Sequence, residues 1–191
     1  MNSQAIVPVW IQSLTQSTSE SSPSQKVLLN VLAVLTGSIL LTVLSRLSIV
    51  LPFTPVPITG QTFGVAFLAL SLGGTRAVSA FALYALEGVV GLPVFAAATG
   101  GATMGYLVGM FVASGVVGYL ADIGAAKTVP RAFLCCVLGS FCVFSFGLIG
   151  MAFFVPANTL LKVGLLPFIP GDIIKNLLAA SLAVSVRRIR R

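Results

Sequence analysis

The feature that most constrains this chain is a succession of long apolar runs that carry almost no charge. Of its 191 residues, 57% are hydrophobic and 8% are charged, too few polar side chains to cover a water-soluble protein of this size. A span of about 20 apolar residues crosses the hydrocarbon core of a bilayer. The sequence therefore predicts an all-α integral membrane protein.

The runs divide the chain into two parts. Residues 1–25 form a polar tail rich in Ser and Gln, which we expect to be disordered. Residues 26–191 form the membrane domain, and no length remains for a separate soluble domain. Six transmembrane helices are expected there, at about residues 27–51, 61–72, 76–90, 102–123, 133–154 and from 170 towards the arginine-rich carboxyl end.

Three of the expected helices are short for a membrane. The helix at 61–72 reaches only ~18 Å at 1.5 Å per residue, against a hydrocarbon core of ~30 Å, and the third and the last should also fall short. Segments rich in Pro and Gly interrupt the chain at 52–60, at 91–101 and up to Gly171, all at the same ends of these helices. Irregular backbone survives at membrane depth only where protein buries it or where it lines a cavity. The interruptions therefore predict one pocket walled by these segments.

The distribution of the 11 Lys and Arg residues predicts the orientation. With a cytoplasmic amino terminus, only Arg46 and Lys162 lie towards the outside, and Lys175 lies within a span. The remaining basic residues fall at inner helix ends: Lys26, Arg76, Lys127, Arg131, Arg187, Arg188, Arg190 and Arg191. We therefore expect both termini in the cytoplasm, an outward-facing pocket, and a multi-pass protein of the inner or plasma membrane. The net charge of +7 then reflects topology and not nucleic-acid binding.

The sequence lacks the residues that several kinds of protein chemistry require. The sequence contains no histidine, and its three cysteines, Cys135, Cys136 and Cys142, lie in one apolar run without a C-x-x-C pair, so they are expected in the core and no metal or cofactor is expected. No nucleophile with an adjacent base appears, so an enzyme is not expected. Residues 73–76 lack the spacing and the lysine of a Walker motif, so the chain cannot energise transport with ATP by itself.

Asp172 and Lys175 are the strongest candidates for ligand binding. An ionisable group at membrane depth costs on the order of 3 kcal/mol unless it is paired or hydrated, and it is a functional candidate for that reason. Three residues apart on a helix, the two side chains share one face and offer an acceptor beside a cation. The alternative is that they only neutralise each other and fix the start of the last helix.

Three more polar residues are candidates, each with an alternative. Glu87 has no basic residue three or four positions away, so it either faces the pocket or is protonated against another helix. Tyr84 lies one turn before it and either contacts a ligand or belongs to the core. Gln61 needs a partner in its apolar setting, either a ligand or a backbone carbonyl.

Small residues favour one close helix contact. Ala33 and Gly37 form a small-xxx-small pair on the first helix, which lets another helix approach closely. We take the pair as a candidate partner interface, although such pairs also arise by chance in membrane spans.

Four segments are informative when taken together: PVPITGQ at 55–61, YALEGVVGLPVF at 84–95, GGATMGYL at 100–107 and IPGDIIK at 169–175. In this order they resemble the BioY family, the biotin-binding S components of energy-coupling factor (ECF) transporters. Gly100 and Gly101, which open the third segment, complete the expected substrate-binding residues. Where the family often has Gly-Pro-Thr-Gly-Gly-Tyr-Leu, residues 101–107 read Gly-Ala-Thr-Met-Gly-Tyr-Leu.

The resemblance implies a six-helix S-component bundle that binds biotin with high affinity. It further implies association with a membrane coupling subunit and two ATPase subunits, and it assigns ligand contacts to Asp172 and Lys175. Two other functions stay open: an S component for another vitamin, and a structural membrane protein that transports nothing.

Overall fold

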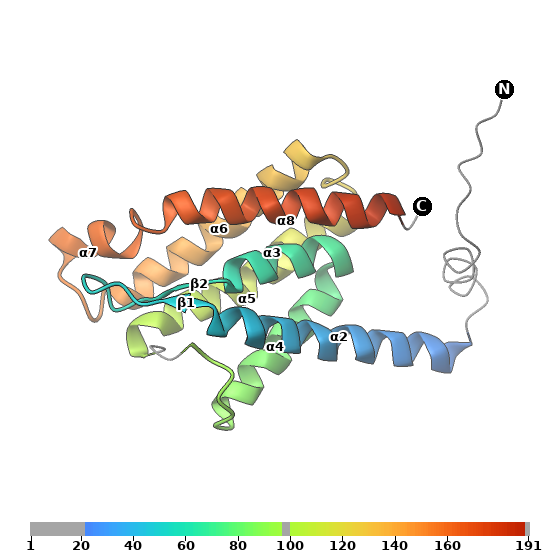
Figure 1. Ribbon diagram of the computed structural model, residues 1–191, viewed down its shortest axis with the longest axis horizontal. Coiled ribbons are helices and arrows are strands. Elements are labelled where there is room, and N and C mark those ends of the chain that lie inside the picture. Colours follow the sequence, from blue (N-terminus) through green and yellow to red (C-terminus); the bar gives the residue numbers. More distant parts are fainter. Residues whose placement is uncertain (1–21, 97–99, 190–191) are drawn as a thin grey trace.

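The computed structural model describes residues 22–96 and 100–189, and within these ranges the chain is mostly helical (Figure 1). The helices are α2 (Pro23–Arg46), α3 (Gln61–Leu72), α4 (Gly74–Val89), α5 (Gly101–Asp122), α6 (Val129–Met151), α7 (Ala157–Gly164) and α8 (Ile169–Ile189). Two short antiparallel strands, β1 (Ser48–Ile49) and β2 (Ile58–Thr59), lie between α2 and α3. The predicted tail lies outside the described residues except for residues 22–25, of which 23–25 already belong to α2.

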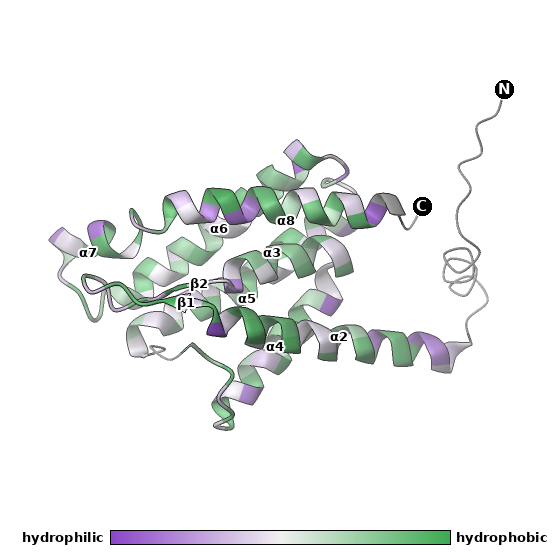
Figure 2. Cartoon of the chain, in the orientation of Figure 1, coloured by the Kyte–Doolittle hydropathy of each residue, from purple (hydrophilic) through white to green (hydrophobic). Residues whose placement is uncertain are grey.

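The helices have the apolar surface that lipid requires. Four helical segments are long and apolar enough to cross a membrane: α2, α5, α6 and the stretch Ala157–Arg187, which includes α7 and most of α8. Hydrophobic residues run along most of α2 in Figure 2, and Val27, Leu28 and Ile39 on it are exposed by 57–62%. Such side chains are stable on a surface only if an apolar medium covers them, so the structure supports a membrane protein.

Local sequence signals set the helix ends. Ser22 caps α2 together with Gln25: the Ser22 hydroxyl accepts from the Gln25 backbone N–H, and the Gln25 side chain accepts from the Ser22 N–H. Between α3 and α4 the chain reverses at Gly73, whose φ of 83° is strained for any residue with a Cβ. The Asp122 carboxylate accepts from the Gly74 N–H at 2.8 Å, which ties the start of α4 to the end of α5.

The helices pack around α3, which contacts α2, α4, α5 and α8, while α5 lies along α6. Strands β1 and β2, helix α7 and the first turns of α5 and α8 lie at one end of the molecule, at the left of Figure 1, and α3 begins next to β2, nearer the middle. The beginning of α2 and the end of α8 lie at the other. We call these the hairpin end and the terminal end.

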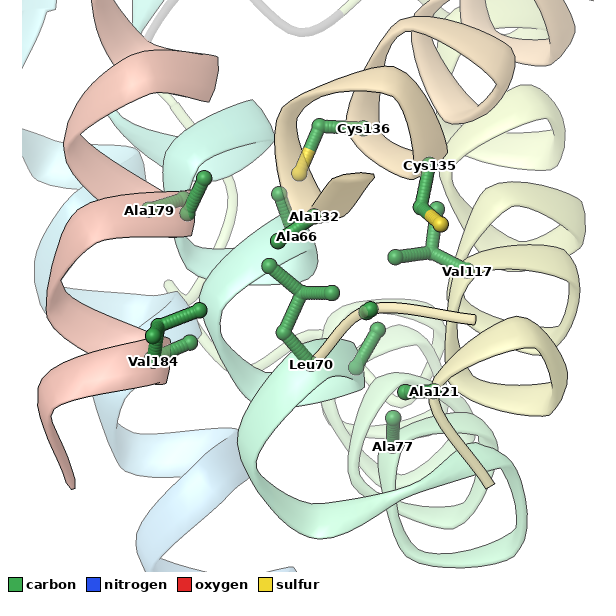
Figure 3. Packing of buried hydrophobic residues seen from close by; sticks show 14 residues of the cluster. Ala66, Leu70, Ala77, Val117, Ala121, Ala132, Cys135, Cys136, Ala179 and Val184 are labelled. Carbon is green, nitrogen blue, oxygen red and sulfur yellow. The ribbon is translucent and has the colours of Figure 1, made fainter. Parts of the chain in front are cut away.

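Small side chains allow this close packing. One core cluster consists largely of alanines together with Leu70, Val117, Cys135 and Cys136 (Figure 3). The two cysteines are free and buried, as the sequence predicted, and Cys142 is half-buried. A Cβ on Gly109 of α5 would lie 2.7 Å from the Cα of Val143 on α6, so only glycine permits the observed contact between these helices.

The structure corrects three expectations. The last helix is not short: α8 continues past Arg187 to Ile189, and its 21 residues span ~32 Å, because basic residues are favourable in the last turn of a helix and do not end it. The first helix ends at Arg46, before the expected residue 51, and the proline-rich segment that follows leads through the hairpin. Helix α7 was not expected at all; its 8 residues directly follow Pro156.

Candidate functional site

A cavity lies at the hairpin end, where α3, α5, α6 and α8 meet the residues around β2. Its volume is about 40 Å³. Its lining consists of Val56, Pro57, Thr59, Gln61, Thr62, Ala96, Thr103, Tyr106, Met110, Val143, Phe144, Phe168, Asp172 and Lys175. A water molecule takes up ~30 Å³ of liquid, whereas small-molecule sites measure ~300–1,000 Å³, so a larger ligand requires the walls to move apart.

Two charged residues from the first turns of α8, Asp172 and Lys175, line this cavity. Asp172, 9% exposed, lies in the first turn of α8. Lys175 donates from Nζ to the carbonyl oxygen of Thr59 on β2 at 2.7 Å. Within the part of the chain that the structure describes, no ion pair joins Asp172 to Lys175, so mutual neutralisation by direct contact does not account for them.

Asn176 positions the aspartate. It is 3% exposed, and its Nδ2 donates to Asp172 Oδ2 at 2.9 Å and to Ser140 Oγ on α6 at 2.8 Å. The sequence analysis missed Asn176, although its position four residues after Asp172 on a helix was a signal that the two share a face.

Gln61 lines the cavity and Tyr84 lies behind it. Gln61 Nε2 donates to the Tyr84 hydroxyl at 2.7 Å, and its Oε1 accepts from Thr59 Oγ1 at 3.0 Å. The side chains of Tyr84 and Thr59 are thus the partners of the amide, and not the backbone carbonyl that was one of the two alternatives. Tyr84 is 0% exposed and packs edge-on against Phe81 and Phe95, which places it in the core.

Glu87, Gly100 and Gly101 lie outside the cavity lining. Glu87 accepts from Ser38 Oγ of α2 at 2.7 Å, so the structure shows the contact with another helix and not the contact with the pocket. Both glycines are exposed at the start of α5; a Cβ on Gly100 would meet nothing within 4 Å, and Gly101 faces the ring of Phe154.

The small-residue pair on α2 makes a contact within the chain. A Cβ on Gly37 would lie 2.8 Å from the Cβ of Ala80 on α4, and Gly37 is buried there. Ala33, one turn earlier, is half-buried. The helix that approaches Gly37 is therefore α4 of this chain and not a partner.

A second, wider groove lies at the terminal end. Its volume is about 470 Å³, and polar groups dominate its walls, where Arg76 Nε donates to Asn30 Oδ1 at 2.8 Å. The described residues contain no group of three His, Cys, Asp or Glu side chains that could hold a metal ion.

Comparison with known proteins finds relatives over most of the chain. The BioY family profile matches residues 15–191. The chain is 36% identical over 151 residues to a biotin transporter BioY of Rhizobium etli, covering 71% of this chain and 80% of the relative. It is 34% identical over 146 residues to the biotin transporter BioY of Thermotoga maritima, covering 73% of this chain and 85% of the relative.

One solved structure shares the fold. It is the S-component for biotin from an ECF-type ABC transporter, with a TM-score of 0.78 over 87% of this chain and 94% of that chain. At 24% sequence identity the likeness concerns the arrangement of the helices.

Proposed function

The chain belongs to the BioY family, and from this premise we propose that it captures biotin at the membrane as the substrate-binding S component of an ECF transporter. Relatives in two bacterial species that are named biotin transporters support the substrate. The role is transport and not catalysis.

The observation that carries the proposal is the pairing of Asp172 and Lys175 in one cavity wall without an ion pair between them among the described residues. Biotin carries a urea ring with N–H donors and a carbonyl, and a tail that ends in a carboxylate. Lys175 supplies a cation for the carboxylate, and Asp172 supplies an acceptor for the N–H groups. The apolar remainder of the wall, including Val143, Phe144 and Phe168, suits the hydrocarbon parts of the ligand.

Binding requires the cavity of about 40 Å³ to widen. Val56, Pro57 and Phe168 belong to connecting segments and not to the long helices, and connections move more readily than packed helices. Lys175 now holds one of them, through the Thr59 carbonyl. Because an ammonium group has three N–H donors, Lys175 can bind a ligand carboxylate and keep this bond, which places Thr59 beside the ligand.

The proposal includes a topology. We place the hairpin end outside and both termini in the cytoplasm, with six helices in the membrane and the cavity open to the outside. Basic residues support this orientation: Lys26, Arg76, Lys127, Arg131 and Arg187 belong to the segments at the terminal end, and Arg46 and Lys162 to those at the hairpin end.

The proposal also includes partners. The sequence carries no G-x-x-x-x-G-K-[ST] phosphate-binding motif, so energy has to come from other subunits. We propose a membrane coupling subunit and two ATPase subunits as these partners, in the plasma membrane or its bacterial equivalent.

Isothermal titration of the detergent-solubilised protein tests the substrate. Biotin should bind with a dissociation constant below about 1 μM, which corresponds to about 8 kcal/mol. Thiamin and riboflavin, added at the same concentrations, should give no heat. Binding of either of these vitamins in place of biotin would make the chain an S component for another substrate.

A further inference from the structure

Two buried hydroxyl groups in the cavity wall lack hydrogen-bond partners. Among the described residues, three buried side-chain oxygens or nitrogens have no partner: Thr62 Oγ1, Ser71 Oγ and Thr103 Oγ1. Thr62 on α3 and Thr103 on α5 line the cavity, and Thr103 is 7% exposed. A buried hydroxyl without a partner lowers stability, so its presence in a binding cavity needs an explanation.

The other neutral polar groups of the wall already have partners. Thr59 Oγ1 donates to Gln61 Oε1, and Gln61 Nε2 donates to Tyr84. The Tyr106 hydroxyl donates to the carbonyl oxygen of Gly164 at 2.7 Å. Of the side-chain hydroxyls that the structure describes in this wall, those of Thr62 and Thr103 alone can therefore donate to a ligand without loss of an existing bond.

The urea ring of biotin needs such donors. Its carbonyl oxygen accepts two hydrogen bonds, and Asp172, as a carboxylate, donates none. In the proposed function, Lys175 is the cation for the carboxylate at the other end of the ligand. We infer that Thr103, together with Thr62, donates hydrogen bonds to the urea carbonyl and so selects for a cyclic urea. This inference rests on the proposed function and adds two ligand-contact residues to it.

If the inference is correct, removal of the Thr103 hydroxyl changes the stability of the protein and its affinity for biotin in opposite directions. Valine has nearly the shape of threonine and lacks the hydroxyl, so Thr103→Val removes the unpaired group from the ligand-free protein and should raise its denaturation temperature. The same change leaves the urea carbonyl without its donor, which should weaken biotin binding by about tenfold or more. A threonine with a purely structural role would not produce this opposition.

The experiment compares matched variants by titration with biotin and with the carboxamide of biotin. Ser71→Ala is the control: Ser71 is the third unpaired hydroxyl, and it lies nine residues beyond Thr62 on α3, ~14 Å along the helix and outside the cavity lining. We expect Ser71→Ala to stabilise the protein without a change in affinity. We expect Thr103→Ser to keep most of the affinity, and Thr62→Val to lose affinity as Thr103→Val does.

The carboxamide identifies which part of the ligand Thr103 contacts. It keeps the urea ring and lacks the negative charge, so Thr103→Val should lose the same factor for both ligands. Equal affinities of Thr103→Val, Thr62→Val and the unchanged protein would overturn the inference, as would a loss seen with biotin and absent with the carboxamide. If the unchanged protein does not bind biotin, the proposed function fails, which is a different result.

Discussion

At the scale of single residues, the cavity combines charge and neutral donors in a way that suits a ligand with two different polar ends. Lys175 is held by a neutral carbonyl and Asp172 by a neutral amide. Neither contact satisfies the charge as an opposite charge would, so a ligand that brings a carboxylate improves the environment of Lys175.

Replacement of Lys175 tests its role. Lys175→Met keeps the length and apolar character of the side chain and removes the cation, so biotin affinity should fall by about a hundredfold, in keeping with the loss of a charge-assisted hydrogen bond. Titration in detergent measures the change. Lys162→Met is the matched control, because Lys162 is an exposed lysine on α7 at the same end and outside the cavity lining. Equal biotin affinities of the two variants would show that Lys175 does not bind the ligand.

Sequence reasoning identified part of the lining of the cavity. Asp172, Lys175 and Gln61 line the cavity, whereas Glu87 contacts Ser38 away from it. Membrane depth was the only criterion for Glu87, and depth does not tell which face of a helix a residue occupies. Thr62 and Thr103 could not be singled out from the sequence, because threonine is common in apolar helices. Only the structure shows that their hydroxyls are unpaired.

At the scale of helices, the most extensive contact is between α5 and α6. Gly105 and Gly109 on α5 face Gly150 and the backbone of Val143 on α6 without room for a Cβ. Close approach of this kind replaces the hydrophobic effect, which does not drive association between helices inside a bilayer.

Substitution of Gly109 tests this packing. In Gly109→Ala the added Cβ would lie 2.7 Å from the Cα of Val143, so the helices must separate, and we expect the free energy of unfolding to fall by about 1–3 kcal/mol. Denaturation in a detergent–SDS titration measures it. Gly115→Ala on the same helix is the control, since its Cβ meets only a methyl of Val78 at 3.5 Å and should leave the protein as stable or more so. Equal destabilisation by both changes would contradict the account.

Tyr106 holds the end of α7 in place. Its hydroxyl donates to the carbonyl of Gly164, and its ring packs against Phe168 at 6.2 Å between centroids. Tyr106→Phe leaves that carbonyl without this donor, so stability should fall by about 1–2 kcal/mol in the same titration. Tyr119→Phe, at a residue that is 63% exposed, should have no effect. If Tyr106→Phe left the stability unchanged, another contact would have to hold α7.

Helix positions were predictable where Gly, Pro or a cap residue marked them. The helix at 61–72 is confirmed to the residue, because Gly60 and Gly73 flank it. The end of α8 was not predictable from apolar length, since a helix continues into its basic last turn. Helix α7 was not predicted because its 8 residues, which follow a proline, are too few to show a helical periodicity.

At the scale of the whole molecule, the two ends differ in structure and in charge. The hairpin end carries the cavity, and the terminal end carries most of the basic residues of the described helices and turns. Sequence alone predicted this division from the placement of Lys and Arg, because it depends on where helices end and not on how they pack.

Cysteine labelling in cells tests the orientation. In a background with Cys135, Cys136 and Cys142 replaced by alanine, single cysteines introduced as Lys162→Cys on α7 and Lys127→Cys between α5 and α6 report opposite ends. A membrane-impermeant thiol reagent should label the first in intact cells and the second only after lysis. The reverse pattern would place the cavity on the cytoplasmic side.

The most direct measurement is a structure of the protein solved with biotin bound. The account predicts biotin at the hairpin end between α3, α5 and α8, with a carboxylate oxygen within hydrogen-bond distance of Lys175 Nζ and the urea ring against Asp172 and Thr103. Biotin in the wider groove at the terminal end, beside Asn30 and Arg76, with the 40 Å³ cavity unchanged, would contradict it.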